Sequence, residues 1–233
     1  MDTIKLLLVE DDDILTYMLK GTLELVGGYE IFTAVNGVEG LSLYNEIHPD
    51  IIVSDIEMTG MSGFEMVKKI RETDSSTPII FASARKNPKD LIEGLNLGAD
   101  NFIRKPYLPE ELHILIKTLL ERISGVGNEG AKEHYRYEFG TYQLDTQLRT
   151  LESKNGKHLS LTDREVSILK ILLDKKGEVV RKDEILIPLW GDNNFYTARS
   201  LDVFMTKIRK HLKEDNTIDL QTIRGEGFRL IYK

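Results

Sequence analysis

The first half of the chain alternates short apolar runs with amphipathic stretches. Five runs suit buried strands, at 4–9, 29–33, 51–54, 79–82 and 101–103. Helical periodicity follows each of them, around 14–26, 37–47, 63–72, 88–97 and 108–122. Strands that alternate with helices form a parallel sheet, and ligands bind beyond the carboxyl ends of its strands. The pattern predicts a five-stranded, doubly wound α/β domain over 1–123 with its chemistry at one rim.

The pattern changes after residue 123. Small residues replace the apolar periodicity, which predicts a flexible linker over 124–134. Four short strand-like pieces come next, at 137–139, 142–144, 148–151 and 157–159. Asn155-Gly156, just before the last of them, is a tight-hairpin signal. Three helical stretches and a terminal hairpin around 224–227 complete the chain. This order predicts an α+β winged helix-turn-helix domain over 135–233.

The three helices of the second half have distinct sequence signals. Thr162-Asp163-Arg164-Glu165 is a capping box that starts the first, whose apolar stripe is Val166, Leu169, Leu172 and Leu173. The second spans roughly 182–189, and Pro188 should kink or end it. The third runs from about Ala198 to Leu212, with a core face of Leu201, Met205, Ile208 and Leu212. The opposite side is expected to be exposed and carries Arg199, Val203, Thr206, Lys207 and Lys210, flanked by Ser200 and Phe204.

Composition narrows the possible functions. The chain has 233 residues, room for two domains, and its 41% hydrophobic and 30% charged residues are typical of a folded protein. It has no cysteine, which excludes disulfides, thiolate metal sites and a cysteine nucleophile and favours the reducing cytoplasm. No apolar run is long enough for a membrane span, and the first residues do not resemble a secretory signal. We therefore expect a cytoplasmic protein with no membrane partner.

Charge is divided unevenly along the chain. Residues 1–123 have 12 Lys and Arg against 21 Asp and Glu, whereas residues 124–233 have 19 against 17. The net charges are −9 and +2, within a total of −7. An acidic half joined to a mildly basic half is expected of a cation-binding domain joined to one that meets a polyanion.

Polar residues follow the predicted strands of the first half. Glu10-Asp11-Asp12 follows the first strand, Asp55 the third, Ser83 the fourth and Lys105 the fifth. Carboxylates held about 5 Å apart repel by roughly 3 kcal/mol per pair at an effective dielectric of 20, so a cation between them is implied. Oxygen ligands favour Mg²⁺ or a similar ion such as Mn²⁺, which accepts phosphate oxygens in turn. One carboxylate could then attack phosphorus while Lys105 and Ser83 hold the phosphoryl oxygens.

These pieces resemble the receiver domain of a two-component response regulator. They are Leu7-Leu8-Val9-Glu10-Asp11-Asp12, Ile51-Ile52-Val53-Ser54-Asp55, Phe81-Ala82-Ser83-Ala84 and Lys105-Pro106-Tyr107. The resemblance implies that a histidine kinase phosphorylates Asp55 and that Mg²⁺ is bound by Glu10, Asp11, Asp55 and the carbonyl of Glu57. It also implies that Ser83 and Lys105 sense the phosphoryl group and that Phe102 is the switch aromatic, without the hydroxyl of the more usual tyrosine.

One sequence feature also resembles a different class of protein. Asp11-x-Asp13 after an apolar strand imitates the nucleophile motif of a Mg²⁺-dependent haloacid-dehalogenase-like phosphatase. That family needs a further acidic pair with glycine near a late strand, and Gly98-Ala99-Asp100 matches it poorly. The aspartate that becomes phosphorylated separates the two, since a receiver would use Asp55 and a phosphatase Asp11. We expect a regulator and no enzyme.

The second half resembles the winged-helix effector domain of OmpR/PhoB-type transcription regulators. The matching residues are Leu161-Thr162-Asp163-Arg164-Glu165, Leu189-Trp190-Gly191 and Thr222-Ile223-Arg224-Gly225-Glu226-Gly227-Phe228-Arg229. Basic and small polar residues on one helix suit phosphates and base edges in a major groove, and an arginine at a hairpin tip suits a minor groove. The predicted DNA-binding residues are Arg199, Ser200, Val203, Phe204, Thr206, Lys207, Arg209, Lys210 and Arg224. The loop 191–196 is a candidate contact for RNA polymerase.

Together the two halves predict a phosphorylation-dependent transcriptional regulator. Phosphate on Asp55 would favour a receiver homodimer, and the paired effector domains would bind adjacent half-sites in double-stranded promoter DNA. The alternative is a regulator that acts without phosphate and keeps an unused acceptor site. The two differ in whether a phosphoryl donor changes the dimer fraction and the affinity for DNA.

Overall fold

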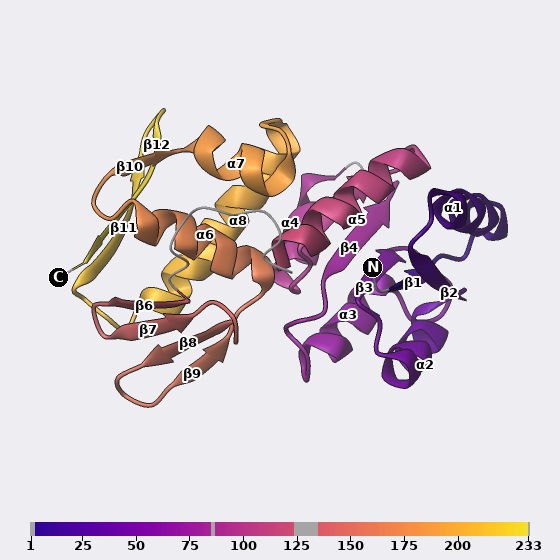
Figure 1. Ribbon diagram of the computed structural model, residues 1–233, viewed down its shortest axis with the longest axis horizontal. Coiled ribbons are helices and arrows are strands. Elements are labelled where there is room, and N and C mark those ends of the chain that lie inside the picture. The colour runs from indigo at the N-terminus through magenta and orange to yellow at the C-terminus, as the bar shows by residue number, and fades with distance from the viewer. Residues whose placement is uncertain (1–2, 85–86, 124–134, 233) are drawn as a thin grey trace. The chain divides into compact units, whose positions relative to one another are not determined.

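The computed structural model describes residues 3–84, 87–123 and 135–232, and the predicted linker at 124–134 lies outside them. The chain divides into two compact units, Met1–Gly130 and Ala131–Lys233 (Figure 1). No helix among the described residues is long and apolar enough to cross a membrane.

The first unit is the predicted doubly wound parallel sheet. Its strands are β1 (Ile4–Val9), β2 (Tyr29–Ala34), β3 (Ile51–Asp55), β4 (Ile79–Ser83) and β5 (Asn101–Arg104), in the spatial order β2-β1-β3-β4-β5. All neighbouring pairs are parallel. Its helices are α1 (Asp13–Val26), α2 (Gly37–Ile47), α3 (Gly63–Arg71), α4 (Pro88–Asn96) and α5 (Pro109–Ile123). The strand order reverses between β1 and β3, which is where such a sheet opens a ligand crevice.

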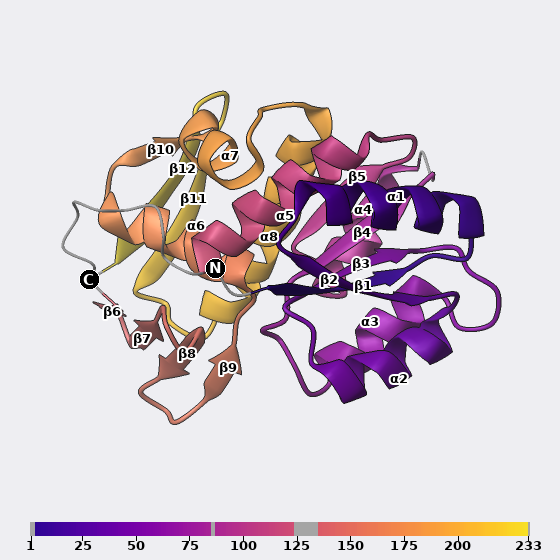
Figure 2. The same ribbon diagram turned by 45° about the vertical axis from the view of Figure 1, so that its right-hand side comes forward.

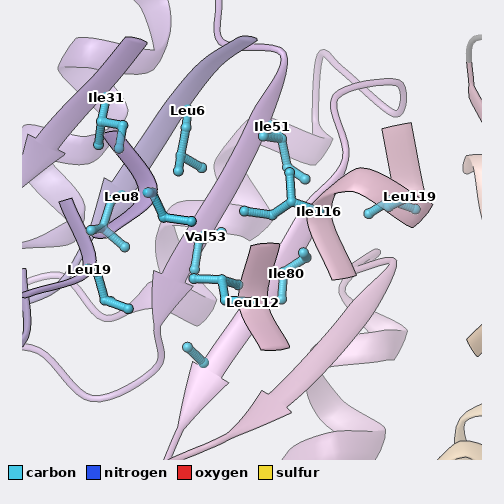
Figure 3. Close-up of a cluster of buried hydrophobic side chains, with 12 residues drawn as sticks. Leu6, Leu8, Leu19, Ile31, Ile51, Val53, Ile80, Leu112, Ile116 and Leu119 are labelled. Atoms are coloured by element: carbon cyan, nitrogen blue, oxygen red, sulfur yellow. The ribbon is translucent and has the colours of Figure 1, made fainter. Parts of the chain in front are cut away.

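Two hydrophobic layers cover the two faces of this sheet. Alternate strand residues such as Leu6, Leu8 and Val53 pack with α1 and α5 on one face (Figure 3). Leu7, Ile52 and Phe81 pack with α2 and α3 on the other, and Figure 2 shows these helix pairs on opposite sides of the strands. Because both faces are covered, β3 and β4 are buried throughout. This rigid sheet fixes the positions of the polar residues at its carboxyl edge.

The second unit has the predicted winged-helix order. An antiparallel sheet of β6 (Arg136–Phe139), β7 (Tyr142–Asp145), β8 (Thr150–Ser153) and β9 (His158–Ser160) comes first. The helices α6 (Asp163–Asp174), α7 (Lys182–Trp190) and α8 (Phe195–Leu212) follow, with β10 (Val179–Arg181) between α6 and α7. The last strands, β11 (Ile218–Ile223) and β12 (Gly227–Tyr232), form the terminal hairpin, and β12 lies between β10 and β11.

Several local predictions are confirmed and others need correction. Thr162 caps α6 in a full capping box, as expected. Pro188 lies inside α7 and the helix ends two residues later, where Gly191 adopts a φ of +84°. The strand expected at 148–151 is displaced to Thr150–Ser153, and α8 starts at Phe195 rather than Ala198. Strand β10 was not predicted, because three residues carry too little pattern to separate from a loop.

Candidate functional site

Three carboxylates converge at the carboxyl edge of the parallel sheet. Glu10 directly follows β1, Asp11 follows Glu10, and Asp55 ends β3. One oxygen from each lies within 4.8 Å of the others. Glu10 and Asp55 are buried, whereas Asp11 is exposed. The expectation that strand-end acids meet at one rim is therefore confirmed for these three residues.

Lys105 is bound between two of these carboxylates. Its Nζ donates to Glu10 Oε2 and to Asp55 Oδ2, both at 2.5 Å. The strand pairing places it there, because Ser83 lies opposite Arg104 and the Lys105 amide donates to the Ser83 carbonyl at 3.0 Å. The next peptide bond, to Pro106, is cis. Ser83 itself is fully buried at the end of β4.

Burial and charge act in opposite directions on this ion cluster. Burial raises the pKa of Glu10 above its usual value, and the hydrogen bond from Lys105 offsets this only in part. Burial also acts against the charge of Lys105, but hydrogen bonds to Asp55 and Glu10 outweigh it and leave its pKa raised. The cluster is therefore held by one ammonium group that balances two buried acids.

The two oxygens of Asp55 have different surroundings. Oδ1 accepts hydrogen bonds from the backbone amides of Ile56 and Glu57, at 2.5 and 3.1 Å. Oδ2 faces the Lys105 ammonium group. The amides fix the orientation of the carboxylate and leave Oδ2 as the oxygen directed into the site. This arrangement suits a carboxylate that acts as a nucleophile.

Other predicted site residues take different positions. Asp12 stands outside the cluster and caps α1, where its Oδ1 accepts from the amides of Ile14 and Leu15. The Glu57 side chain is exposed and not among the three converging carboxylates, so its expected role rests on its carbonyl and stays a prediction. Phe102 is half-buried against the α2 and α3 layer of the core.

Sequence reasoning gave no role to Gly63. A β-carbon at Gly63 would lie 2.0 Å from the Asp55 carbonyl oxygen, so only glycine lets α3 begin this close to the end of β3. The Gly63 amide also donates to the Ile56 carbonyl at 3.1 Å. The cluster of turn residues at 60–63 predicts a turn, but the contact with Asp55 depends on tertiary structure.

Helix α8 carries the second set of predicted site residues, and its core face is confirmed. Leu201, Met205, Ile208 and Leu212 are buried. The expectation that Ser200, Val203 and Phe204 are exposed is wrong, since their exposed fractions are 4, 9 and 0%. Phe204 packs against Trp190 of α7, and α6 also contacts α8, so the helix buries a wider arc than one apolar stripe suggests. Because these three side chains are buried, they are not available to contact DNA.

The remaining exposed residues form a narrower stripe on α8. Arg199, Asp202, Thr206 and Lys210 are exposed at spacings of three, four and four. Lys207 is half-buried, with its Nζ 5.4 Å from the centre of the Phe204 ring. Arg224 is exposed in the turn between β11 and β12. Basic side chains therefore point outward on both the helix and the hairpin, as a phosphate-binding surface requires.

Arg209 has a structural partner. Its Nε donates to the Leu220 carbonyl at 3.0 Å, and its Nη2 donates to Thr222 Oγ1 at 2.6 Å. These bonds attach α8 to strand β11. The predicted DNA contact by Arg209 therefore has to coexist with a role in holding the hairpin against the helix.

Comparisons with known proteins agree with this arrangement. Residues 6–117 match the family described as response regulator receiver domain, and residues 156–230 match the family described as transcriptional regulatory protein, C terminal. The chain is 35% identical over 230 residues to the transcriptional regulatory protein RprY of Bacteroides fragilis, covering 99% of this chain and 95% of RprY. This chain is a two-component response regulator of the OmpR/PhoB type.

Two further relatives support the response-regulator assignment. The aerobic respiration control protein ArcA of Escherichia coli is 30% identical over 233 residues, which covers 98% of this chain and 97% of ArcA. The solved structure of the response regulator DrrB, an OmpR/PhoB homolog from Thermotoga maritima, is 26% identical and covers 98% of this chain and 99% of DrrB, with a TM-score of 0.51.

The acidic cluster of this response regulator fits a hard divalent cation. It supplies oxygen ligands only, two of them from buried side chains, as Mg²⁺ prefers. Glu10, Asp11 and Asp55 would hold the ion, which supplies positive charge to phosphate oxygens when bound. The chain itself orients Asp55 through the amides of Ile56 and Glu57 and provides the ammonium group of Lys105.

Proposed function

We propose that this response regulator is switched by phosphorylation of Asp55 and that its phosphorylated form dimerises and binds promoter DNA. The observation that carries the proposal is the geometry of Asp55, whose Oδ1 is fixed by two amides while Oδ2 faces Lys105 among the metal-binding carboxylates. A histidine kinase is the expected donor, and the protein would act in the cytoplasm without turning over an external substrate.

The transfer step uses groups already in the site. Asp55 Oδ2 attacks phosphorus, the bond from phosphorus to the donor nitrogen breaks, and the donor imidazole leaves with that electron pair. Lys105, released from Asp55 Oδ2, neutralises a phosphoryl oxygen, and the Ser83 hydroxyl at the end of β4 donates to another. The buried surroundings strengthen both interactions.

The DNA-binding step uses the exposed basic residues of α8 and its hairpin. Arg199, Thr206, Lys207 and Lys210 suit contacts along a major groove, and Arg224 suits the adjacent minor groove. Phe195 and Tyr196 lie 59 and 41% exposed at the start of α8, so this region remains our candidate contact for RNA polymerase. Dimerisation would raise the effective concentration of the second effector domain without altering α8.

Asp55→Asn tests the acceptor assignment. We expect the full chain to incorporate phosphate from acetyl phosphate with Mg²⁺, and the variant to incorporate none while keeping its circular dichroism spectrum. Asp12→Asn is the matched control, because asparagine caps a helix as well as aspartate and Asp12 lies outside the cluster. Phosphate uptake that persists in Asp55→Asn would refute the assignment, and uptake on Asp11 would indicate a phosphatase-like site.

The wild type and Asp55→Asn also test the alternative, a regulator that acts without phosphate. DNA ligands are selected from random duplexes, and dimer fraction and affinity are then measured with and without acetyl phosphate. We expect both to rise with the donor in the wild type and to stay constant in Asp55→Asn. Equal values in the wild type under both conditions would favour a regulator that does not use its acceptor.

A further inference from the structure

Tyr107, two residues after Lys105, has a buried hydroxyl group without a hydrogen-bond partner among the described residues. Two other half-buried tyrosines have hydrogen-bond partners for their hydroxyls: Tyr29 contacts His113 Nδ1 at 2.8 Å, and Tyr44 donates to Asp74 Oδ2 at 2.8 Å. A buried hydroxyl without a partner is destabilising, whereas phenylalanine would fill nearly the same space without that penalty. Packing alone therefore does not explain a tyrosine here.

The packing of the ring places Tyr107 on one particular face of the parallel sheet. Tyr107 packs against the core layer that contains Leu8 of β1 and Val53 of β3. Because strand side chains alternate between faces, Glu10 and Asp55 follow Leu8 and Val53 on that same face. Tyr107 thus lies on the side of the sheet from which the two carboxylates extend.

Electrostatics independently connects the phenol with these carboxylates. Burial first, and then the negative charges of Glu10 and Asp55, raise the pKa of Tyr107 above its usual value. A phenol is protonated at neutral pH even without such a shift, so the hydroxyl is available as a donor. The carboxylates that act on it are acceptors, and Glu10 has the larger effect.

Lys105 is the strong donor to Glu10 in this structure. Glu10 Oε2 accepts from Lys105 at 2.5 Å, and Oε1 receives only a long hydrogen bond of 3.4 Å from the Asp12 amide. When Lys105 turns toward a phosphoryl group, Glu10 loses its strong donor. A new donor to this buried carboxylate would then fix its orientation.

We propose that Tyr107 is a positioning residue of the acceptor site and that its hydroxyl donates to the Glu10 carboxylate when the site is loaded. This inference rests on the proposed function, because it assumes that the cluster binds a divalent cation and a phosphoryl group. The bond holds the Glu10 carboxylate oriented toward the cation after Lys105 has left it.

Tyr107→Phe tests the role of the hydroxyl in the full chain. Calorimetric titration with MgCl₂ in the presence of beryllofluoride, a phosphoryl mimic, measures the dissociation constant for Mg²⁺. We expect the variant to bind Mg²⁺ about 3- to 10-fold more weakly, as the loss of one hydrogen bond predicts. Without Mg²⁺ the variant should be at least as stable as the wild type, because it lacks the unsatisfied hydroxyl.

A thermodynamic cycle with Glu10→Gln separates positioning from a general structural effect. If Tyr107 acts through Glu10, its removal should change Mg²⁺ affinity less than 2-fold in the Glu10→Gln background. Tyr29→Phe is the matched control, since its hydroxyl bonds to His113 and we expect lower stability with unchanged Mg²⁺ affinity. A full 3- to 10-fold loss in the Glu10→Gln background would overturn the proposal.

The outcomes also distinguish this inference from the proposed function. If wild-type protein binds neither Mg²⁺ nor beryllofluoride, the acceptor assignment itself fails, and the Tyr107 proposal fails with it. If the wild type binds both and Tyr107→Phe binds Mg²⁺ equally well, only the role of Tyr107 is overturned.

Discussion

The acceptor site depends on one lysine that serves two buried carboxylates. Lys105 donates to both Glu10 and Asp55 at 2.5 Å, which reduces the repulsion that two acids would exert on each other. Burial still raises the pKa of Glu10, so its ionised form is costly in the folded protein. A site prepared for a cation is therefore less stable than an uncharged site of the same shape would be.

Glu10 should make stability depend on pH. Its carboxyl ionises near pH 4.5 in the unfolded chain and at higher pH in the folded chain, so the folded state retains the proton longer. The stability contributed by this group is present below pH 4.5 and is lost as the pH rises through the folded pKa. Glu10→Gln should remove that loss and raise the melting temperature of the receiver domain at pH 7.

Calorimetry in EDTA measures this difference in melting temperature. With added MgCl₂ the wild type should melt above Glu10→Gln, because only the carboxylate binds the cation. Glu46→Gln, at an exposed position of α2, is the control and should leave the melting temperature unchanged both in EDTA and with MgCl₂. A Glu10→Gln protein that melts below the wild type in EDTA would show that the carboxylate stabilises the fold.

The close approach of α3 to β3 fixes the position of Asp55. Gly63 begins α3 against the Asp55 carbonyl, and Ser62 caps the helix with Glu65 in a capping box. The amides of Ile56 and Glu57 that orient Asp55 belong to the segment between these two elements. Moving the start of the helix would move the donors of the acceptor carboxylate.

Gly63→Ala should therefore affect both stability and the site. A β-carbon at 2.0 Å from a backbone oxygen has no room, and we expect a loss of about 2–3 kcal/mol in the free energy of unfolding together with weaker Mg²⁺ binding. Gly21→Ala is the matched control: its β-carbon meets open space within α1, so a gain of about 0.5–1 kcal/mol is expected. Urea unfolding and Mg²⁺ titration measure the two effects. Unchanged Mg²⁺ affinity in Gly63→Ala would show that the helix start does not position Asp55.

Some features of the helices and strands could be predicted from the sequence pattern, and others could not. The range of β1 could be predicted because it is a short continuous apolar run, and the core face of α8 because its apolar residues follow a period of 3.6 residues. The burial of Phe204 could not, because a helical wheel does not show how many neighbours cover a helix. Asp12 was grouped with the acids by its position, and only the structure shows that its carboxylate caps α1.

The negative net charge of the chain opposes the proposed binding to DNA. The chain carries −7 overall, so attraction to a polyanion depends on where its basic residues lie. The exposed positions Arg199, Lys210 and Arg224 place positive charge on α8 and its hairpin. The division into an acidic and a mildly basic half could be read from the sequence, but the set of outward-facing residues required the fold.

Lys210→Ala should weaken DNA binding in a salt-dependent way. If Lys210 contacts a phosphate, the slope of log affinity against log salt should become shallower by up to about one unit, with no change in stability because the side chain is exposed. Lys154→Ala, in the exposed turn between β8 and β9, removes the same charge elsewhere and is expected to leave the slope unchanged. Titrations at several salt concentrations compare them, and equal slopes for both variants would exclude a phosphate contact by Lys210.

Strand β12 lies in the middle of its sheet, between β10 and β11, although it is the last of the three to be synthesised. A growing polypeptide cannot close this sheet until residues 227–232 have left the ribosome. An interrupted translation product that stops before them would keep its acceptor aspartate and lack the strand that joins β10 to the hairpin. Under the proposed function, such a fragment would still accept a phosphoryl group on Asp55 but would lack a complete DNA-binding domain.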